Sequence, residues 1–397
     1  MSRAWKAVVM AALLAAVALV IVACGSSGGS SSSGNTSANE GSGAETSESE
    51  GAETSESESE GVDTAAAEKL VAPYLGHPTA FPVEEPLKER PPAGSTFAYL
   101  QCSSPFCGLF AEQLKGATKA MGVKLAVVKA GASASELQTA MSSIIAMKPA
   151  AVIVPSVEES IPKQLAELDE MGIPVGGAGI IDPEKYGVDV NFQGEPVFSE
   201  EGKVLAAWSV LREGESTNAV FYATPELSFS PVVEAGFNEA LEELCSSCST
   251  RSVTIPLSEY GNKAPSHVVS DLQANPETNV GIFASEEGAE GLSAQLKTAG
   301  LEEVAINGNG ATPAILQEIA SGGIAGAMGI DTNMLVWGLV DGLSRVLANQ
   351  PLSPVEEKGQ APMQLLEQKD VEGVDVEHGF VAYPEGEKKF EELWSGK

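Results

Sequence analysis

The feature that most constrains the fold is a regular alternation of short apolar runs with helix-length amphipathic segments, from residue 95 onward. The runs at 96–100, 124–128 and 151–155 have the pattern of buried strands, and 109–121 and 136–147 between them carry apolar residues at helical spacing. Strands separated by helices predict parallel sheets with helices on both faces. Because about 300 residues of this pattern exceed what one core usually holds, we predict an α/β fold with two lobes.

The N-terminus carries an export signal. Arg3 and Lys6 precede an apolar run at 7–23, and the small Ala23 stands directly before Cys24. We interpret residues 1–23 as a lipoprotein signal peptide, with Cys24 as the lipid-modified residue that anchors the protein outside the cell membrane. An ordinary signal peptide or a short membrane anchor is the alternative.

Two segments without a core-forming pattern follow the signal. Residues 24–64 are rich in Gly, Ser and Glu and contain the repeat GAETSESE at 43–50 and 51–58, which predicts a disordered acidic tether. Residues 65–94 hold six prolines, which favour an extended segment laid against a lobe.

The charge balance excludes several classes of function. The chain has 23 Lys plus Arg against 55 Asp plus Glu, a net charge of −32. Binding of nucleic acid, or of an anionic membrane through protein charge, is therefore not expected. The 3 His are scattered and stand beside none of the acidic pairs, so we expect no metal, no cofactor and no enzyme activity.

Four cysteines remain besides Cys24, and disulfides persist outside the cytoplasm. Their spacing suggests the pairs Cys102–Cys107 and Cys245–Cys248, although four cysteines permit three connectivities. A thioredoxin-like function of the CSSC motif is the alternative, but such a motif opens a helix, and this one follows a predicted helix.

Three stretches, in this order, resemble the type I periplasmic-binding-protein family, in particular its sugar-binding branch that serves ABC importers. They contain SSPF at 103–106, KPAAVIVP at 148–155 and GIFASEEGAEG at 281–291. The resemblance implies two Rossmann-like lobes with parallel sheets, joined by a three-strand hinge, with a small ligand enclosed between them. It assigns 95–190 plus 331–371 to the N-terminal lobe and 191–330 plus 372–397 to the C-terminal lobe, with crossings near 190–193, 329–331 and 371–375.

The resemblance also implies a set of ligand-binding residues in the loops that follow the strands. These are Ser103, Ser104, Phe106, Phe192, Gln193, Tyr260, Ser285, Glu286, Asn309, Asp331 and Asn333. Phe106 matches the aromatic residue that stacks on a sugar face in the family. Several charged residues of the family have no counterpart in this chain. Val233 occupies the position of a family Arg, and Gly179 and Ile180 occupy those of an Asp-Arg pair. The turn 308–311 lacks the family's Asp. An unpaired buried hydroxyl costs about 1–3 kcal/mol, so these losses favour a less hydroxylated solute.

We therefore expect an extracytoplasmic solute-binding lipoprotein that acts as a monomer and delivers a small molecule to an ABC permease. A lipid-anchored sensor that presents its closed form to a membrane receptor is the alternative, and sequence alone does not separate the two.

Overall fold

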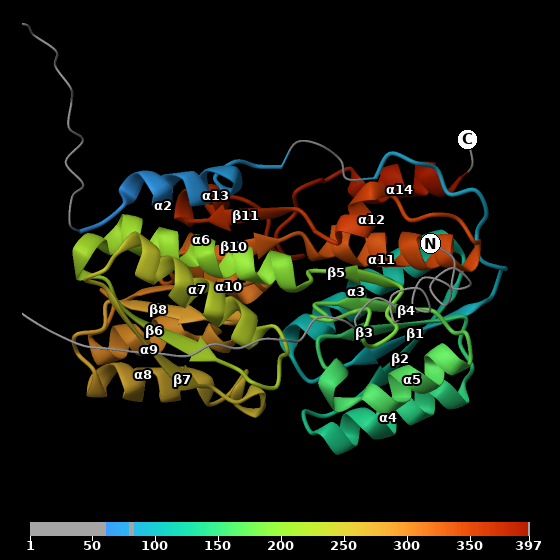
Figure 1. The fold of residues 1–397 in the computed structure, drawn as a ribbon, viewed down its shortest axis with the longest axis horizontal. Coiled ribbons are helices and arrows are strands. Elements are labelled where there is room, and N and C mark those ends of the chain that lie inside the picture. Colours follow the sequence, from blue (N-terminus) through green and yellow to red (C-terminus); the bar gives the residue numbers. More distant parts are fainter. Residues whose placement is uncertain (1–60, 79–82, 396–397) are drawn as a thin grey trace, which may run out of the picture. The chain divides into compact units, whose positions relative to one another are not determined.

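The computed structural model describes residues 61–78 and 83–395 (Figure 1). The predicted signal peptide, Cys24 and the tether up to residue 60 lie outside these residues. The described chain forms two α/β lobes, each built on its own parallel sheet, which confirms the predicted fold class. Among the described helices, none combines the length and the apolar character needed to cross a membrane.

The first lobe has a parallel five-stranded sheet in the order β2-β1-β3-β4-β5. Its strands are β1 (Thr96–Gln101), β2 (Lys124–Lys129), β3 (Ala151–Pro155), β4 (Val175–Ala178) and β5 (Val190–Phe192). All five residues of β3 are buried, as expected for a central strand covered on both faces. Its helical segments are α3 (Pro105–Met121), α4 (Ala134–Ala146), η2 (Glu158–Ser160), α5 (Pro162–Glu170), α11 (Thr332–Leu347) and α12 (Pro354–Lys358).

Local signals in the sequence set the helix boundaries. Pro105 opens α3, where its missing N–H leaves no internal bond unmade, and Gly122 ends it in the left-handed conformation. Ser133 and Glu136 form a capping box at the start of α4.

The second lobe has a parallel four-stranded sheet in the order β7-β6-β8-β9. Its strands are β6 (Asn218–Ala223), β7 (Ser249–Thr254), β8 (Val280–Phe283) and β9 (Ala305–Gly308). A short antiparallel pair, β10 (Ala327–Ile330) and β11 (Met363–Leu366), lies beside β9. The helical segments are α6 (Glu195–Glu213), η3 (Gly214–Ser216), α7 (Ser230–Leu244), η4 (Leu257–Glu259), α8 (Ala264–Ala274), η5 (Glu286–Ala289), α9 (Leu292–Ala299), α10 (Pro313–Ala320) and α13 (Gln368–Val371).

Three crossings between the lobes are bonded to one another. The amide N–H of Gln193 donates to the carbonyl of Gly359, and the N–H of Ala361 donates to the side chain of Gln193. The N–H of Asp331 donates to the carbonyl of Pro362. The third crossing therefore lies near 359–362, and not at 371–375 as predicted from the family order.

The C-terminal part of the predicted lobe assignment needs correction. β11 and α13 belong to the second lobe, since β11 pairs with β10 and α13 packs against α10. The final helix, α14 (Gly386–Trp394), packs against α3 and α11 of the first lobe, where Trp394 stacks on Trp337 at 5.1 Å between ring centroids. An amphipathic helix shows in its sequence which face is buried but not which lobe buries it, and this explains the error.

The Pro-rich segment also differs from the prediction of a wholly extended chain. Its start forms α2 (Thr64–Val71), capped by Asp63, and η1 (Ala72–Tyr74), since its prolines begin only at Pro73. Helix α2 packs against α6 and α7 of the second lobe, whereas Leu87 and Arg90 bond to the backbone of α14 in the first. The described parts of this segment thus contact both lobes.

A group of charged side chains is fully buried in the first lobe. Arg345 of α11 donates to Asp341 at 2.6 Å and lies 3.3 Å from Glu356. Trp394 donates its indole N–H to Asp341 at 2.6 Å, and Arg345 also donates to the carbonyl of Glu85. This network joins α11, α12, α14 and the Pro-rich segment.

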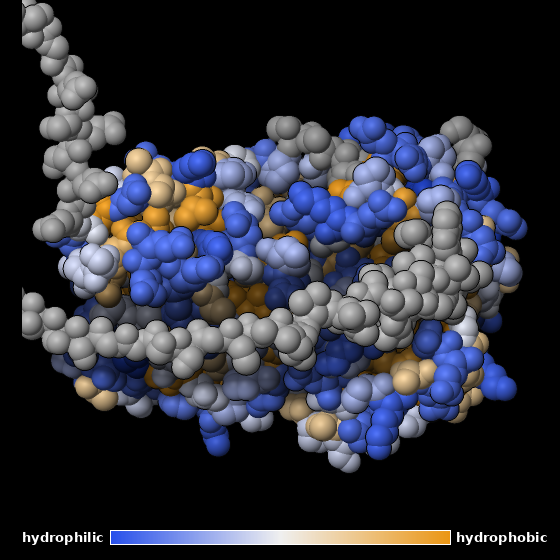
Figure 2. All heavy atoms as spheres, viewed as in Figure 1, coloured by the Kyte–Doolittle hydropathy of each residue, from blue (hydrophilic) through white to orange (hydrophobic). Residues whose placement is uncertain are grey.

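On the surface, hydrophilic residues make up most of the described face seen in Figure 2.

Candidate functional site

A cavity of about 90 Å³ lies between the lobes, at the carboxyl ends of the parallel strands and beside the first two crossings. This edge is where ligands bind in open α/β sheets. One water needs about 10–15 Å³ on this measure, so the space suits a small solute. Its lining is mainly apolar, with a smaller set of polar side chains: Ser104, Ser156, Gln193, Ser285, Glu287, Asn309 and Thr332.

The wall from the first lobe runs from the end of β1 into the first turn of α3. A disulfide joins Cys102, directly after β1, to Cys107 in that turn, and both cysteines line the cavity. This segment presents the Ser104 hydroxyl, the backbone N–H of Phe106 and the Phe106 ring. Closing so short a segment by a covalent bond restricts its conformations, which preorganises this wall.

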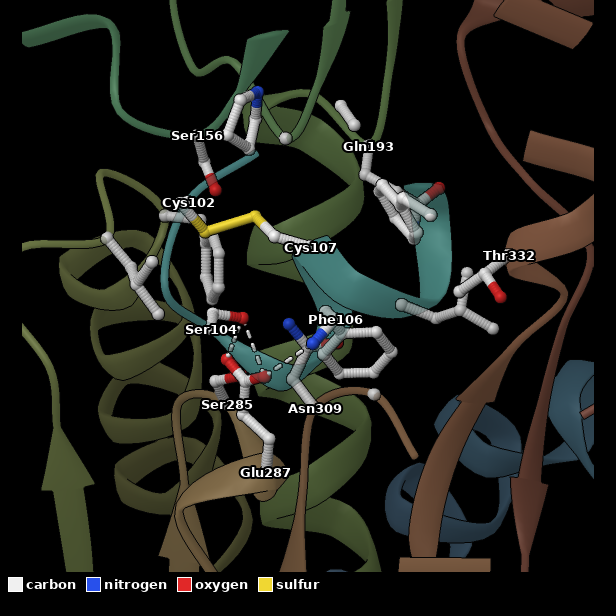
Figure 3. A pocket seen from close by; sticks show the side chains of 18 of the residues that line it. Cys102, Ser104, Phe106, Cys107, Ser156, Gln193, Ser285, Glu287, Asn309 and Thr332 are labelled. Atoms are coloured by element: carbon white, nitrogen blue, oxygen red, sulfur yellow. Dashed lines mark hydrogen bonds between the residues drawn. A yellow bond between two sulfur atoms is a disulfide. The ribbon is translucent and has the colours of Figure 1, made fainter. Parts of the chain in front are cut away.

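The wall from the second lobe carries the carboxylate of Glu287, on the turn η5 after β8 (Figure 3). Ser104 donates to its two oxygens at 2.9 and 2.7 Å, and the N–H of Phe106 donates at 3.0 Å. Ser285, of the same lobe, donates at 3.2 Å. The Ser104 and Phe106 bonds cross from one lobe to the other and hold the two walls together.

Burial governs the protonation of Glu287. The residue is 2% exposed, and this desolvation raises the pKa of the carboxyl to about 7, although the hydrogen bonds from Phe106, Ser104 and Ser285 oppose the rise. Glu290 nearby raises it further by charge repulsion. Glu287 therefore changes its ionisation near neutral pH.

The turn after β9 completes the second-lobe wall. Gly310 has φ +77, and a Cβ there would lie 2.9 Å from Cζ of Phe106, so glycine permits the close approach of the two walls. The side-chain oxygen of Asn309 is buried and has no hydrogen-bond partner among the described residues. It lines the cavity and is a candidate acceptor for a bound solute.

Phenylalanine rings from both lobes supply much of the apolar lining. Phe106 and Phe110 of α3 meet edge to face at 6.3 Å, and Phe198 stacks on Phe229 at 4.5 Å with 14° between the planes. The remaining large apolar residues in the lining include Leu227, Ile330 and Leu335.

Gln193 lies where the cavity meets the hinge. It adopts φ +58, and its amide donates to Glu201 at 2.9 Å while accepting from the N–H of Ala361 at 3.0 Å. Glu201 is fully buried, which raises its pKa to about 8. The side chain of Gln193 is therefore engaged by the hinge, and we assign it a positioning part in the site.

The structure brings five of the predicted ligand-binding residues to the cavity: Ser104, Phe106, Gln193, Ser285 and Asn309. The other six do not line it: Ser103, Phe192, Tyr260, Glu286, Asp331 and Asn333.

Each of these six has a different environment. Ser103 is exposed, and Phe192 packs against α11 near Gly338. Tyr260 bonds to Thr224 behind the wall, and Asn333 donates to Glu387. Asp331 caps α11 and also accepts from the N–H of Ala382, so its carboxylate serves the hinge and not the cavity.

The sequence prediction chose Glu286 where the structure presents Glu287. Glu286 is fully buried behind the wall, and its burial and the nearby Glu318 raise its pKa. In a short 3-10 turn, neighbouring residues point in different directions, so a shift of one residue exchanges the two carboxylates. Ser156, Phe198, Phe229 and Thr332 were also missed, and each stands just after a strand or at the start of a helix, which is the signal that could have found them.

The second disulfide joins Cys245 to Cys248 after α7, at the opposite end of that helix from the lining residue Phe229. Both disulfides are the pairs that the spacing suggested. In the described part of the chain, no group of His, Cys, Asp and Glu side chains is arranged to hold a metal ion.

Comparison with known proteins supports the same architecture. No curated protein matches the sequence. Among solved structures, a subunit of an ABC sugar transporter from Rhodobacter sphaeroides has 16% identity and a TM-score of 0.61, over 70% of this chain and 99% of its own. A protein from Mycobacterium smegmatis in complex with β-D-fucofuranose has 16% identity and a TM-score of 0.61, over 76% of this chain and 98% of its own.

A third similar structure is a carbohydrate transporter from Acidothermus cellulolyticus in complex with myo-inositol. It has 15% identity and a TM-score of 0.59, over 70% of this chain and 96% of its own. At these identities the likeness concerns the fold. Residues 97–351, more than half of the 397-residue chain, match the family described as the periplasmic binding protein domain. The chain therefore belongs to the periplasmic-binding-protein family.

Proposed function

We propose that this protein is an extracytoplasmic solute-binding lipoprotein of an ABC importer, which encloses a small solute between its lobes and delivers it to a membrane permease. The observation that carries the proposal is the cavity between the lobes, lined by side chains of both. A solute there contacts both walls, so it binds more tightly when they approach and shifts the protein toward the closed arrangement.

The composition of the lining supports a solute with few hydroxyl groups. Sugar hydroxyls need buried partners, and an unpaired one costs about 1–3 kcal/mol. Here Gln193 is engaged by the hinge, and much of the remaining surface is aromatic or aliphatic. The site suits an apolar or aromatic body with a small number of polar groups.

Membrane attachment through Cys24 is a separate part of the proposal. It is supported by the apolar run, the small residue before Cys24 and the polar segment after it. A labelled fatty acid should be incorporated into the wild-type protein and into Cys107→Ala, but not into Cys24→Ala. Equal labelling of the Cys24 variant, or no labelling of the wild type, would contradict lipid anchoring at this residue.

The first test of solute binding is a thermal-shift screen of the purified protein against sugars, polyols, amino acids, amines and aromatic acids. A ligand at a hundred times its Kd adds about 2.7 kcal/mol of stability, which raises the Tm by several degrees. Ser156→Phe should remove the shift by filling the cavity, and Ser142→Phe, on the exposed face of α4, should retain it. A shift that survives Ser156→Phe would place binding elsewhere.

Uptake then separates the importer from the sensor alternative. Deletion of the gene should abolish uptake of the identified solute if the protein feeds a permease. Unchanged uptake, together with loss of a transcriptional response to the solute, would favour the sensor.

A further inference from the structure

The cavity holds a buried carboxylate for which the described chain provides no cation. The donors to Glu287 are two hydroxyl groups and one backbone N–H, all uncharged. Among the described residues, no Lys, Arg or His forms an ion pair with it, and Glu287 alone of the described lining residues can carry a charge.

We propose that the solute is a small organic cation, whose ammonium or similar group lies beside Glu287 and whose apolar part contacts the phenylalanine rings of the cavity. This inference rests on the proposed function and names the chemical class of its ligand.

The first argument is the cost of an isolated buried charge. A carboxylate removed from water is strongly destabilised unless a charge of opposite sign or several hydrogen bonds compensate it. The three donors to Glu287 compensate in part, because burial still raises its pKa to about 7. A bound cation would supply the missing positive charge and favour the ionised form.

The second argument is the aromatic lining. Phe106, Phe110, Phe198 and Phe229 come from both sides of the cavity. The faces of aromatic rings carry partial negative charge and attract ammonium groups, and such aromatic enclosures are a known means of binding quaternary ammonium ligands. A sugar would also stack on one ring, but it would need hydrogen-bonding groups where this cavity has further rings.

The third argument is the charge of the whole chain. A net charge of −32 raises the local concentration of cations and lowers that of anions near the protein. An anionic solute would have to approach against this field and enter a cavity whose ionisable lining residue is an acid.

The test is calorimetry of the purified protein, at pH 8 and physiological salt, with cations and uncharged analogues of the same shape. The pairs are choline with 3,3-dimethyl-1-butanol and benzylamine with benzyl alcohol. We expect at least one cation to bind at least tenfold more tightly than its uncharged analogue. Glu287→Gln should remove this preference, whereas Glu302→Gln, an exposed residue with the same change in charge, should retain it.

Equal binding of cation and analogue, or an undiminished preference in Glu287→Gln, would overturn the inference and leave solute binding in place. So would binding of a sugar or polyol in the earlier screen without binding of any cation. If no compound binds in either the calorimetry or the earlier thermal-shift screen, both the inference and the proposed function fail. The Tm of each unliganded variant shows whether it has folded.

Discussion

Two buried carboxylate sites in this protein are built in opposite ways. In the first lobe, Asp341 and Glu356 lie against Arg345, and all three side chains are fully buried. In the cavity, Glu287 is 2% exposed and receives only uncharged donors among the described residues. The chain thus supplies a cation to this buried pair of the first lobe and none to the acid that faces the cavity. Glu201 and Glu286 are also buried without a cation, but they lie outside the cavity lining, so it is the combination of a cation-free buried acid and a cavity that points to a ligand.

The largest expected effect is on the scaffold site. Arg345→Met removes the cation and leaves Asp341 and Glu356 close together, which should lower the free energy of unfolding by about 3–5 kcal/mol. Urea denaturation measures it, with Arg212→Met on the surface as the control. A loss below about 1 kcal/mol would mean that buried acids in this fold need no cation, and the contrast with Glu287 would lose its meaning.

Glu201 sharpens the comparison as a buried acid with neither a cation nor a place in the cavity lining. Its folded pKa of about 8 lies above the ordinary value of 4.5, so the folded state binds the extra proton. Glu201 therefore makes its full contribution to the free energy of unfolding below pH 4.5, and this contribution is lost as the pH rises to 8. Between pH 4.5 and pH 7 the loss is on the order of 3 kcal/mol. Glu201→Gln should flatten the pH dependence of the urea midpoint. An unchanged slope would show that other groups cause it.

The ionisation of Glu287 gives a smaller effect on binding. With a pKa of about 7, the carboxyl is mostly protonated at pH 6 and mostly ionised at pH 8. A cation should therefore bind about tenfold more weakly at pH 6, which is about 1.4 kcal/mol, and should release a proton on binding. Calorimetry in buffers of different ionisation enthalpy measures that proton. An uncharged analogue that releases the same proton would contradict the assignment.

The smallest expected effect concerns a single ring. Phe106→Leu keeps an apolar side chain but removes the aromatic face, so cation affinity should fall by about 0.5–1 kcal/mol. The affinity of the uncharged analogue should change less. Equal losses for both ligands would mean that Phe106 contributes shape and not charge attraction.

Much of the fold could be predicted from the sequence because strands and helices leave periodic patterns. The alternation between residues 95 and 348 predicted both parallel sheets, and the spacing of the cysteines suggested both disulfide pairs. The lobe to which α14 belongs could not be predicted, because its apolar face is compatible with either core. The exchange of Glu286 for Glu287 has a similar origin, since a four-residue turn has no period that indicates which acid faces inward.

The burial of Arg345 could not be predicted from the sequence either. The spacing of Asp341 and Arg345 by four residues on a helix is usual for exposed ion pairs, and only the packing of α12, α14 and the Pro-rich segment encloses it here. Sequence spacing indicates which charges meet, whereas burial depends on segments distant in the chain.

The placement of the first and last described helices has a practical consequence. Helix α2 is part of the second lobe and α14 is part of the first, so residues near 64 and 394 report on different lobes. A donor dye attached before α2 and an acceptor after α14 would change their energy transfer when the lobes rotate against each other. The protein therefore offers a design for an optical biosensor that needs no insertion into either sheet.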